Sequence, residues 1–282
     1  MTARKPPKPA VRVPEIAVSG GQRRKSQRIV PEEVPVAFTY NRLSHAVMMA
    51  SPADLEDFAV GFSLAERVVE RADEIEQLEV VTRDIGIELR MWIGKDRIDT
   101  YSDRRRHLAG PTGCGLCGME SLEETVRAAP HVSASLTVSA ETISAAIAAM
   151  PPGQRLNHET RAVHAAAFWM PDRDIVALRE DVGRHNALDK LAGALARQGI
   201  AGAEGIVLLT SRVSVEMVQK AAIIGASILV AVSAPTALAI RTAEAAGITL
   251  IAIARGQDFE IFTHPNRIVA GRVAETQVRH VA

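Results

Sequence analysis

A chain of 282 residues with 47% hydrophobic residues can bury a sizeable core, and its length favours two domains. Basic and acidic residues balance at 33 each, which gives no indication of nucleic-acid or membrane-surface binding. The longest apolar runs, such as 223–232, are too short for a bilayer, and no apolar segment of a secretory signal follows the basic N-terminus. We therefore expect a cytoplasmic protein that binds neither nucleic acid nor membrane.

The first 28 residues are rich in proline, lysine and arginine and include Gly20-Gly21. Such a composition buries little apolar surface, so residues 1–28 are predicted to be a flexible tail. Ordered structure is expected to begin near residues 34–38, where apolar side chains alternate as they do in a strand.

Residues 29–135 are predicted to form a small α+β domain. Ser51-Pro52-Ala53-Asp54 is typical of a helix start, with a capping serine, an early proline and a carboxylate in the first turn. The apolar residues after it recur at helical spacing: Leu55, Phe58, Ala59 and Phe62. Residues 85–93 alternate between apolar and polar, which predicts a half-buried strand.

Residues 136–276 have the pattern of an α/β domain. A helix over 137–150 ends at Pro151-Pro152, and a hairpin of two strands follows, over 161–169 and 174–179. Helices are then predicted to alternate with strands, the helices over 186–198, 215–224 and 235–246 and the strands over 205–209, 227–232 and 248–253. Continuous apolar strands between helices indicate a parallel sheet covered on both faces. The predicted fold class is therefore α/β, with a C-terminal three-layer α/β/α domain that is preceded in the chain by the smaller α+β domain.

Four polar turns follow predicted strands of this sheet, at residues 180–186, 210–212, 233–236 and 254–258. Ligands of such sheets bind beyond the carboxyl ends of the strands, so four polar turns at one edge favour a ligand site. Arg212 is placed to clamp a phosphate there. For the turn at residues 180–186, a purely structural role explains the residues as well as a ligand site does, with Asp181 as a helix cap and His185 packed locally.

The only two cysteines of the chain, Cys114 and Cys117, lie in the segment Gly113-Cys114-Gly115-Leu116-Cys117-Gly118. Glycines let a partner approach the sulfur atoms closely. A capping box at residues 121–124 predicts a helix start just beyond them, and three arginines precede them at 104–106. Both features favour the thiolate, which is the nucleophilic form of cysteine. The segment is therefore predicted to be a reactive loop at the end of the first domain.

Three kinds of chemistry use a Cys-x-x-Cys pair. A zinc site of the nucleobase-deaminase kind needs a third ligand and a glutamate two residues after a histidine or cysteine, and no such glutamate is present. A thioredoxin-like dithiol has this spacing, but the pair does not follow the first strand of a βαβ unit. Sulfur transfer through a persulfide requires the same residues, since thiol exchange governs it too. The spacing alone does not separate the last two kinds of chemistry.

Several motifs together resemble the formate dehydrogenase accessory sulfurtransferase family, FdhD. The resemblance runs from about Pro31 to Arg267 in the family's order, and the motifs that carry it are Ser51 to Phe62, Thr112 to Gly118, Glu180 to Ala187, Glu216 to Lys220, Val232 to Thr236 and Thr263-His264-Pro265. Members of that family accept sulfur from a cysteine desulfurase and pass it to the molybdenum cofactor, a bis-molybdopterin guanine dinucleotide, before the cofactor enters formate dehydrogenase. Their second domain resembles the cytidine-deaminase fold without the zinc chemistry.

The resemblance implies roles for named residues. Cys114 matches the family's persulfide carrier, and Cys117 matches the second family cysteine. The family's cofactor segment falls on Ile253, Ala254, Arg255, Gly256, Gln257 and Asp258, although Asp258 stands where a basic residue is often found. Arg184, Arg212 and Arg255 supply positive charge for the phosphates of the cofactor.

The expected function is therefore that of a sulfur carrier for the molybdenum cofactor. The cofactor is a bound substrate, and we expect no metal held directly by the protein. The expected partners are a cysteine desulfurase and formate dehydrogenase, and a homodimer is left open. Two alternative functions are a non-catalytic chaperone that only binds the cofactor or the apoenzyme, and a dithiol oxidoreductase.

Overall fold

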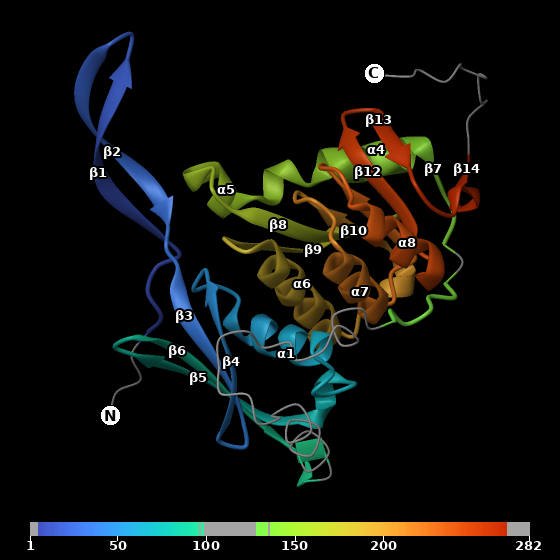
Figure 1. Cartoon of the computed structure of the whole chain (residues 1–282), viewed down its shortest axis with the longest axis horizontal. Coiled ribbons are helices and arrows are strands. Elements are labelled where there is room, and N and C mark those ends of the chain that lie inside the picture. The colour runs from blue at the N-terminus through green and yellow to red at the C-terminus, as the bar shows by residue number, and fades with distance from the viewer. Residues whose placement is uncertain (1–4, 96, 99–127, 135, 270–282) are drawn as a thin grey trace.

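The computed structural model describes residues 5–95, 97–98, 128–134 and 136–269 of the chain. These residues form two domains in contact and a two-stranded arm that projects from them (Figure 1). Within this part of the chain, no helix is both long and apolar enough to cross a membrane.

The arm is the antiparallel hairpin of β1 (Ala10–Ser19) and β2 (Gln22–Pro31). The prediction of a flexible tail over residues 1–28 is therefore wrong for residues 10–28. The two strands are joined by Gly20 and Gly21, whose φ angles of 57° and 79° match the two-residue turn that best fits the twist of a hairpin. Backbone pairing along ten residues of each strand thus orders a sequence that is too polar to form a core.

The N-terminal domain packs one helix, α1 (Leu55–Ala65), on a four-stranded sheet in the order β4-β3-β6-β5. Its strands are β3 (Val34–Tyr40), β4 (Leu43–Ala50), β5 (Ile75–Arg83) and β6 (Gly86–Ile93), with a short 3-10 turn at Ala72–Glu74. The strand predicted over 85–93 is confirmed, because its alternate residues Ile87, Leu89, Met91 and Ile93 are buried under α1.

Helix α1 begins later than the Ser51-Pro52 motif predicts. Its N-cap is Asp54, which has a left-handed backbone and makes no capping bond through its side chain. Ser51 is instead bonded to the other domain, since its backbone N–H donates to Asp181 and its hydroxyl accepts from the N–H of Val182. A tertiary contact therefore replaces the predicted helix cap.

The second domain is built on a six-stranded sheet in the order β13-β12-β11-β10-β8-β9. Its strands are β8 (His164–Met170), β9 (Asp174–Asp181), β10 (Ile206–Leu209), β11 (Ile228–Ala231), β12 (Thr249–Arg255) and β13 (Asp258–Ile261). Its helices are α4 (Ala140–Ala149), α5 (Arg155–Thr160), α6 (Arg184–Gln198), α7 (Val215–Ile224) and α8 (Ala237–Ala246). Two short strands, β7 (Val138–Ser139) and β14 (Ile268–Val269), pair beside it, and 3-10 turns lie at Pro151–Gly153, Gly202–Glu204 and Pro265–Arg267.

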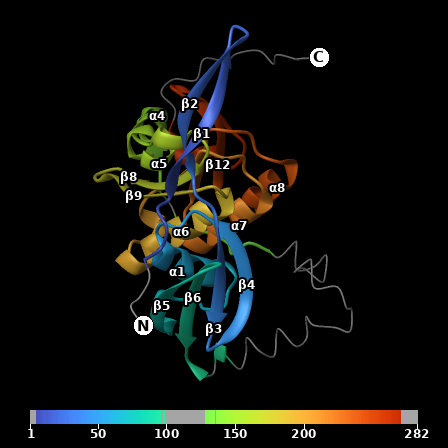
Figure 2. The same cartoon turned by 90° about the vertical axis from the view of Figure 1, so that its left-hand side faces the viewer.

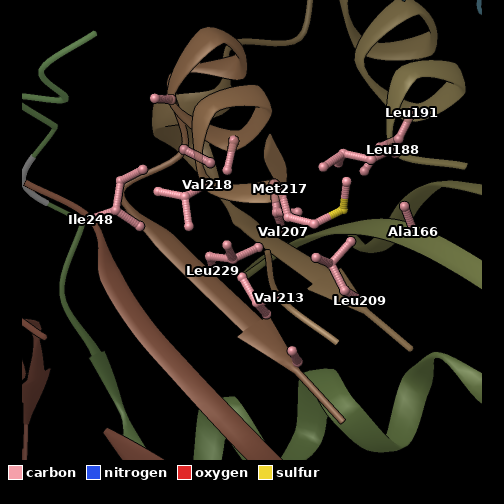
Figure 3. Packing of buried hydrophobic residues seen from close by; sticks show 14 of the residues in the cluster. Ala166, Leu188, Leu191, Val207, Leu209, Val213, Met217, Val218, Leu229 and Ile248 are labelled. Atoms are coloured by element: carbon pink, nitrogen blue, oxygen red, sulfur yellow. The ribbon is translucent and has the colours of Figure 1, made fainter. Parts of the chain in front are cut away.

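The three predicted layers are present. Val207 and Leu209 of β10 face α6 and α7 and pack with Leu188 and Met217, as Figure 3 shows from close by. The alternate residues of the same strand, including Leu208, pack on the opposite face with α4. Because both faces are covered, the central strands are apolar without interruption, and the predicted α/β fold class is confirmed.

The two domains meet where α1 crosses α6, and no side chain separates the helices at the crossing. A Cβ atom on Gly61 would lie 1.7 Å from the carbonyl oxygen of Asp189, and one on Gly193 would lie 1.9 Å from that of Asp57. Asp57 also accepts hydrogen bonds from Arg179 and Arg197 of the second domain. The helices therefore touch backbone to backbone, and the buried Asp57 carboxylate joins the two domains through these arginines at the same place.

The chain enters the second domain before the boundary predicted at residue 135. Ala129 and Ala134 pack against the core of that domain, and Val132 belongs to it. The N–H of Val132 also donates to the carbonyl oxygen of Ala246 at the end of α8.

Candidate functional site at the carboxyl edge of the large sheet

Four strands of the six-stranded sheet end at the same edge. Strand β9 is antiparallel to β8, and β8 is antiparallel to β10, so β9 and β10 run in the same direction. Strands β11 and β12 continue the sheet in parallel with β10. The four polar turns that the sequence singled out therefore lie along one edge, as predicted (Figure 1).

The last of these turns is not a strand-to-helix turn. Strand β12 continues to Arg255, reverses at Gly256-Gln257, and pairs with β13 so that Arg255 lies opposite Asp258. The predicted cofactor segment, Ile253 to Asp258, is thus the tip of a β-hairpin. Arg255, Gly256, Gln257 and Asp258 are exposed there, whereas Ala254 is buried in the core.

A β-bulge interrupts the pairing of β12 and β13 within this segment. The register shifts between Ala252 and Arg255, and Ile253 has a φ of 55°, in the left-handed region that a β-branched residue rarely adopts. Its side chain is 38% exposed, and its N–H donates to the carbonyl oxygen of Ser233, at 3.3 Å, in the turn after β11. Such strain costs about 1–3 kcal/mol and clusters at ligand sites, where bulges redirect side chains.

Arg184 and His185 form the first turn of α6 at the other end of this edge. The Nε atom of Arg184 and the Nε2 atom of His185 are shielded from solvent, and neither has a hydrogen-bond partner among the described residues. A buried polar atom without a partner costs about 1–3 kcal/mol. An acceptor from a ligand would remove that cost at the Nε–H of Arg184, and a ligand acceptor or donor, according to the tautomer of the ring, would remove it at His185.

His185 faces Glu216, the second residue of α7. The two side chains are 3.8 Å apart, between Nε2 and Oε2, and the hydroxyl of Ser214 donates to the same carboxylate oxygen at 2.6 Å. Burial lowers the pKa of His185, and the charges of Arg184 and Lys220 lower it further, against the opposing effect of Glu216. Sequence reasoning gave His185 only local packing and Glu216 only a place in a family motif, and it did not pair them, although both residues begin helices that follow strands of the sheet.

A fully buried ion pair positions the start of α6. The carboxylate of Asp181 accepts from the ammonium group of Lys190 at 2.6 Å and from the N–H of Gly183 at 2.8 Å. It also accepts from the N–H of Ser51 and from the side-chain amide of Asn186. Asp181 thus fixes the turn before Arg184 and joins it to the N-terminal domain.

Arg212 is exposed in the turn after β10. The next residue, Val213, is buried and forms an isolated bridge with Pro235 in the turn after β11. Thr236 caps α8 by accepting from the N–H of Ala239, which accounts for one hydroxyl of that turn. The bridge holds the turns after β10 and β11 side by side, and Arg212 lies next to the bridge with its side chain exposed to solvent.

The site residues are spread along the edge rather than gathered at one point. Four strand spacings of about 4.8 Å separate β9 from β12, so the ends that carry Arg184 and Arg255 lie about 19 Å apart. A single phosphate cannot reach both arginines. An elongated ligand with several phosphates can.

Cys114 and Cys117 lie outside the described residues, as does the helix predicted after them. The described chain stops at Ile98, which packs on the core of the N-terminal domain, and resumes at Ala128, whose carbonyl oxygen accepts from Arg67. Within the described ranges, no three histidine, cysteine, aspartate or glutamate side chains are grouped so that they could hold a metal ion.

Comparison with known proteins places this architecture in a family. Residues 31–269 match the model of the FdhD/NarQ family. A sulfur carrier protein FdhD from Agrobacterium fabrum is 55% identical over 259 residues, which are 92% of this chain and 96% of the relative. One from Brucella abortus is 53% identical over 87% of this chain and 91% of the relative.

The fold is also similar to a solved structure. The crystal structure of a candidate formate dehydrogenase accessory protein from Desulfotalea psychrophila matches with a TM-score of 0.74 and 25% sequence identity. The match covers 92% of this chain and 99% of that protein. Because the family model and close relatives extend over both domains, the chain belongs to the FdhD/NarQ family.

Proposed function

We propose that this chain is a sulfur carrier in the maturation of formate dehydrogenase, with Cys114 as the residue that carries the sulfur. The observation that carries this proposal is the 55% identity to a relative named sulfur carrier protein, over 92% of this chain. The matched residues, 31–269, include both cysteines of the chain. No other side chain of this sequence forms a persulfide.

In the loading step, the Cys114 thiolate attacks the outer sulfur of a persulfide on a cysteine desulfurase. A new S–S bond forms on Cys114, the old S–S bond breaks, and the desulfurase cysteine leaves as a thiolate, so no electrons are gained or lost overall. In delivery, the outer sulfur passes to the molybdenum cofactor and Cys114 leaves as a thiolate. The transferred sulfur becomes a sulfide ligand by taking two electrons, which a reduced molybdenum centre supplies.

The carboxyl edge of the large sheet binds the cofactor in this proposal. The support is the strained bulge at Ile253, the two buried nitrogen atoms without partners at Arg184 and His185, and the exposed cations along the edge. Arginine forms charge-assisted hydrogen bonds with phosphate. The bis-molybdopterin guanine dinucleotide is long and carries several phosphates, which suits an edge whose cations are about 19 Å apart by strand spacing.

The sulfur step is tested by mass spectrometry of the intact protein after incubation with a cysteine desulfurase and cysteine. We expect one added sulfur on the wild type and none on Cys114→Ser, which keeps the size of the side chain but removes the nucleophile. Cys117→Ser is the matched control and should still load sulfur. Loss of two protons in place of the added sulfur would mean a dithiol oxidoreductase, and no change in mass would mean a chaperone that only binds.

The cofactor edge is tested by calorimetry with GDP, which represents the nucleotide end of the cofactor. Arg255→Ala should weaken binding about ten- to a hundredfold, since a charge-assisted hydrogen bond contributes roughly 1.5–3 kcal/mol. Arg173→Ala, on the exposed turn between β8 and β9, is the control and should leave the affinity unchanged. Absence of GDP binding by the wild type, or equal binding by Arg255→Ala, would show that the edge is wrongly assigned.

A further inference from the structure

The arm, residues Ala10 to Pro31, stands outside both hydrophobic cores. Figures 1 and 2 show it projecting from the body, and its principal contact there is α5 at its base. None of its residues is buried, and two aliphatic side chains near its tip, Ile16 and Val18, are 62% and 64% exposed. A two-stranded hairpin on its own is only marginally stable in water, so a covering surface would stabilise it.

The arm is also strongly basic. It carries five basic side chains and one carboxylate, Glu15, in a chain whose formal net charge is 0. The five are Arg12, Arg23, Arg24, Lys25 and Arg28, and none forms an ion pair with a described residue. Unpaired cations at this density are complementary to an acidic surface.

The strand register combines the two features on one face. Ile16 lies opposite Lys25 and Val18 lies opposite Arg23, and directly opposed residues of an antiparallel pair share a face. Apolar side chains flanked by cations are the composition of a protein-binding patch with a polar rim. The arm has no aromatic residue on which a nucleic-acid base could stack, so the exposed aliphatic side chains favour a protein partner.

The arm is anchored next to the proposed cofactor edge. Its strands contact α5, and the first turn of α5 is held by Glu180, which accepts from the N–H groups of Leu156 and Asn157 at 2.8 Å each. Glu180 stands four residues before Arg184. A cleft of about 630 Å³ lies between the arm base, Asp54 and α5. The arm therefore extends from the neighbourhood of that edge, with Ile16 and Val18 about 20 Å or more from its base at about 3.3 Å per residue.

We propose that the arm docks on an acidic surface of the formate dehydrogenase apoenzyme, the recipient of the cofactor. This inference rests on the proposed function, because it names the partner of the same site. The family model begins at residue 31, where β2 ends, so the arm lies outside the residues that this model matches. Exposed Ile16 and Val18 bind the apolar centre of the contact, and the cations pair with carboxylates around it.

The experiment measures the affinity of the full-length protein for the full-length apoenzyme at 0.1 M and at 0.5 M salt. Arg23→Glu with Lys25→Glu should weaken binding about tenfold or more at low salt and less at high salt, because exposed charge pairs are screened. Ile16→Ser with Val18→Ser should weaken it about tenfold at both salt concentrations, because lost apolar burial is not screened.

The matched controls change the same kinds of exposed side chain, two apolar and two cationic, at positions outside the arm. Val47 and Met49 on β4 are 61% and 48% exposed, so Val47→Ser with Met49→Ser is the apolar control. Lys95→Glu with Arg173→Glu reverses two exposed charges outside the arm. Both controls should bind like the wild type. Sulfur loading by the desulfurase should be equal in all variants, which shows that they are folded and active.

The outcomes separate this inference from the proposed function. Equal affinity of the arm variants and the wild type, or equal weakening by the control variants, overturns the docking role. Dissociation of the protein itself on mutating the arm, seen by sedimentation, assigns the arm to a second copy and also overturns it. A wild type that neither binds nor activates the dehydrogenase refutes the proposed function, whatever the arm does.

Discussion

At the scale of single residues, the positive charge of Arg184 lowers the pKa of two histidines. Burial lowers the pKa of His164, at the start of β8, and the charge of Arg184 lowers it further. His185 responds to the same two causes in the same order. Both imidazoles therefore favour the neutral form, and neither adds positive charge to that of Arg184 at neutral pH.

Arg184→Gln should raise the pKa of both His164 and His185, because it removes a positive charge and keeps the approximate size of the side chain. The measurement is an NMR titration of the ring protons. Arg212→Gln is the control, since the charge of Arg212 is not among the causes that lower the pKa of either histidine. Unchanged titration curves in Arg184→Gln would mean that this arginine does not face the two rings.

The residues of the site could be predicted from the sequence only in part. Four polar turns after four strands were enough to place Arg184, Arg212 and the 253–258 segment at one sheet edge. The strain at Ile253 depends on a bulge in the strand register, and the buried nitrogen atoms of Arg184 and His185 depend on packing between helices. Neither property has a signature in local composition.

At the scale of elements, the crossing of α1 and α6 depends on two glycines. Helices normally approach with side chains between them, at about 8–10 Å between axes. Here each glycine faces the backbone of the other helix, and a methyl group at either one would overlap a carbonyl oxygen. The carbonyl oxygens belong to helical hydrogen-bond ladders and cannot move aside without bending a helix.

Gly61→Ala should destabilise the protein by about 3 kcal/mol, at the upper end of the usual cost of overpacking. The measurement is the free energy of unfolding in urea. Gly94→Ala is the matched control, because a Cβ there would meet only the end of the Glu76 side chain, at 3.4 Å, and the cost should be within about 0.5 kcal/mol. A Gly61→Ala variant as stable as Gly94→Ala would mean that the helices cross elsewhere.

The predicted elements of the second domain agree with the structure because each apolar run is bounded by glycine, proline or a polar cap. The elements that differ do so for three different reasons. The start of α1 is moved by bonds between Ser51 and Asp181, which are 130 positions apart. The arm was missed because its composition outweighed the Gly20-Gly21 turn and the alternation around it. β13 (Asp258–Ile261) was missed because it is a short, largely exposed edge strand without a continuous apolar run.

At the scale of the whole molecule, the domains are joined by polar contacts as well as by the helix crossing. Lys190 is fully buried between them, bonded to Asp181 and to the carbonyl oxygen of Ser51, and it lies 5.4 Å from the ring centre of Phe58. If the domains separated, Asp181 and Lys190 would lose the hydrogen bonds that they make with the backbone of Ser51. Partial unfolding at the interface is therefore costly.

We expect the two domains to unfold in a single calorimetric transition, with equal calorimetric and van't Hoff enthalpies. Gly61→Ala should split the transition in two by weakening the interface, and Gly94→Ala should not. Two resolved transitions in the wild type would contradict the expectation and would mean that the domains are only loosely associated.

The backbone contact between α1 and α6 also limits how sulfur can travel. A hinge between two domains normally allows a donor group to swing towards an acceptor, as lids and closing domains do in many enzymes. Here a rotation of one domain against the other would press Gly61 and Gly193 into the facing carbonyl oxygens, so we expect Ile98 and the carboxyl edge of the large sheet to keep a constant separation. For the proposed sulfur transfer we therefore expect the two domains to keep one arrangement throughout the reaction cycle.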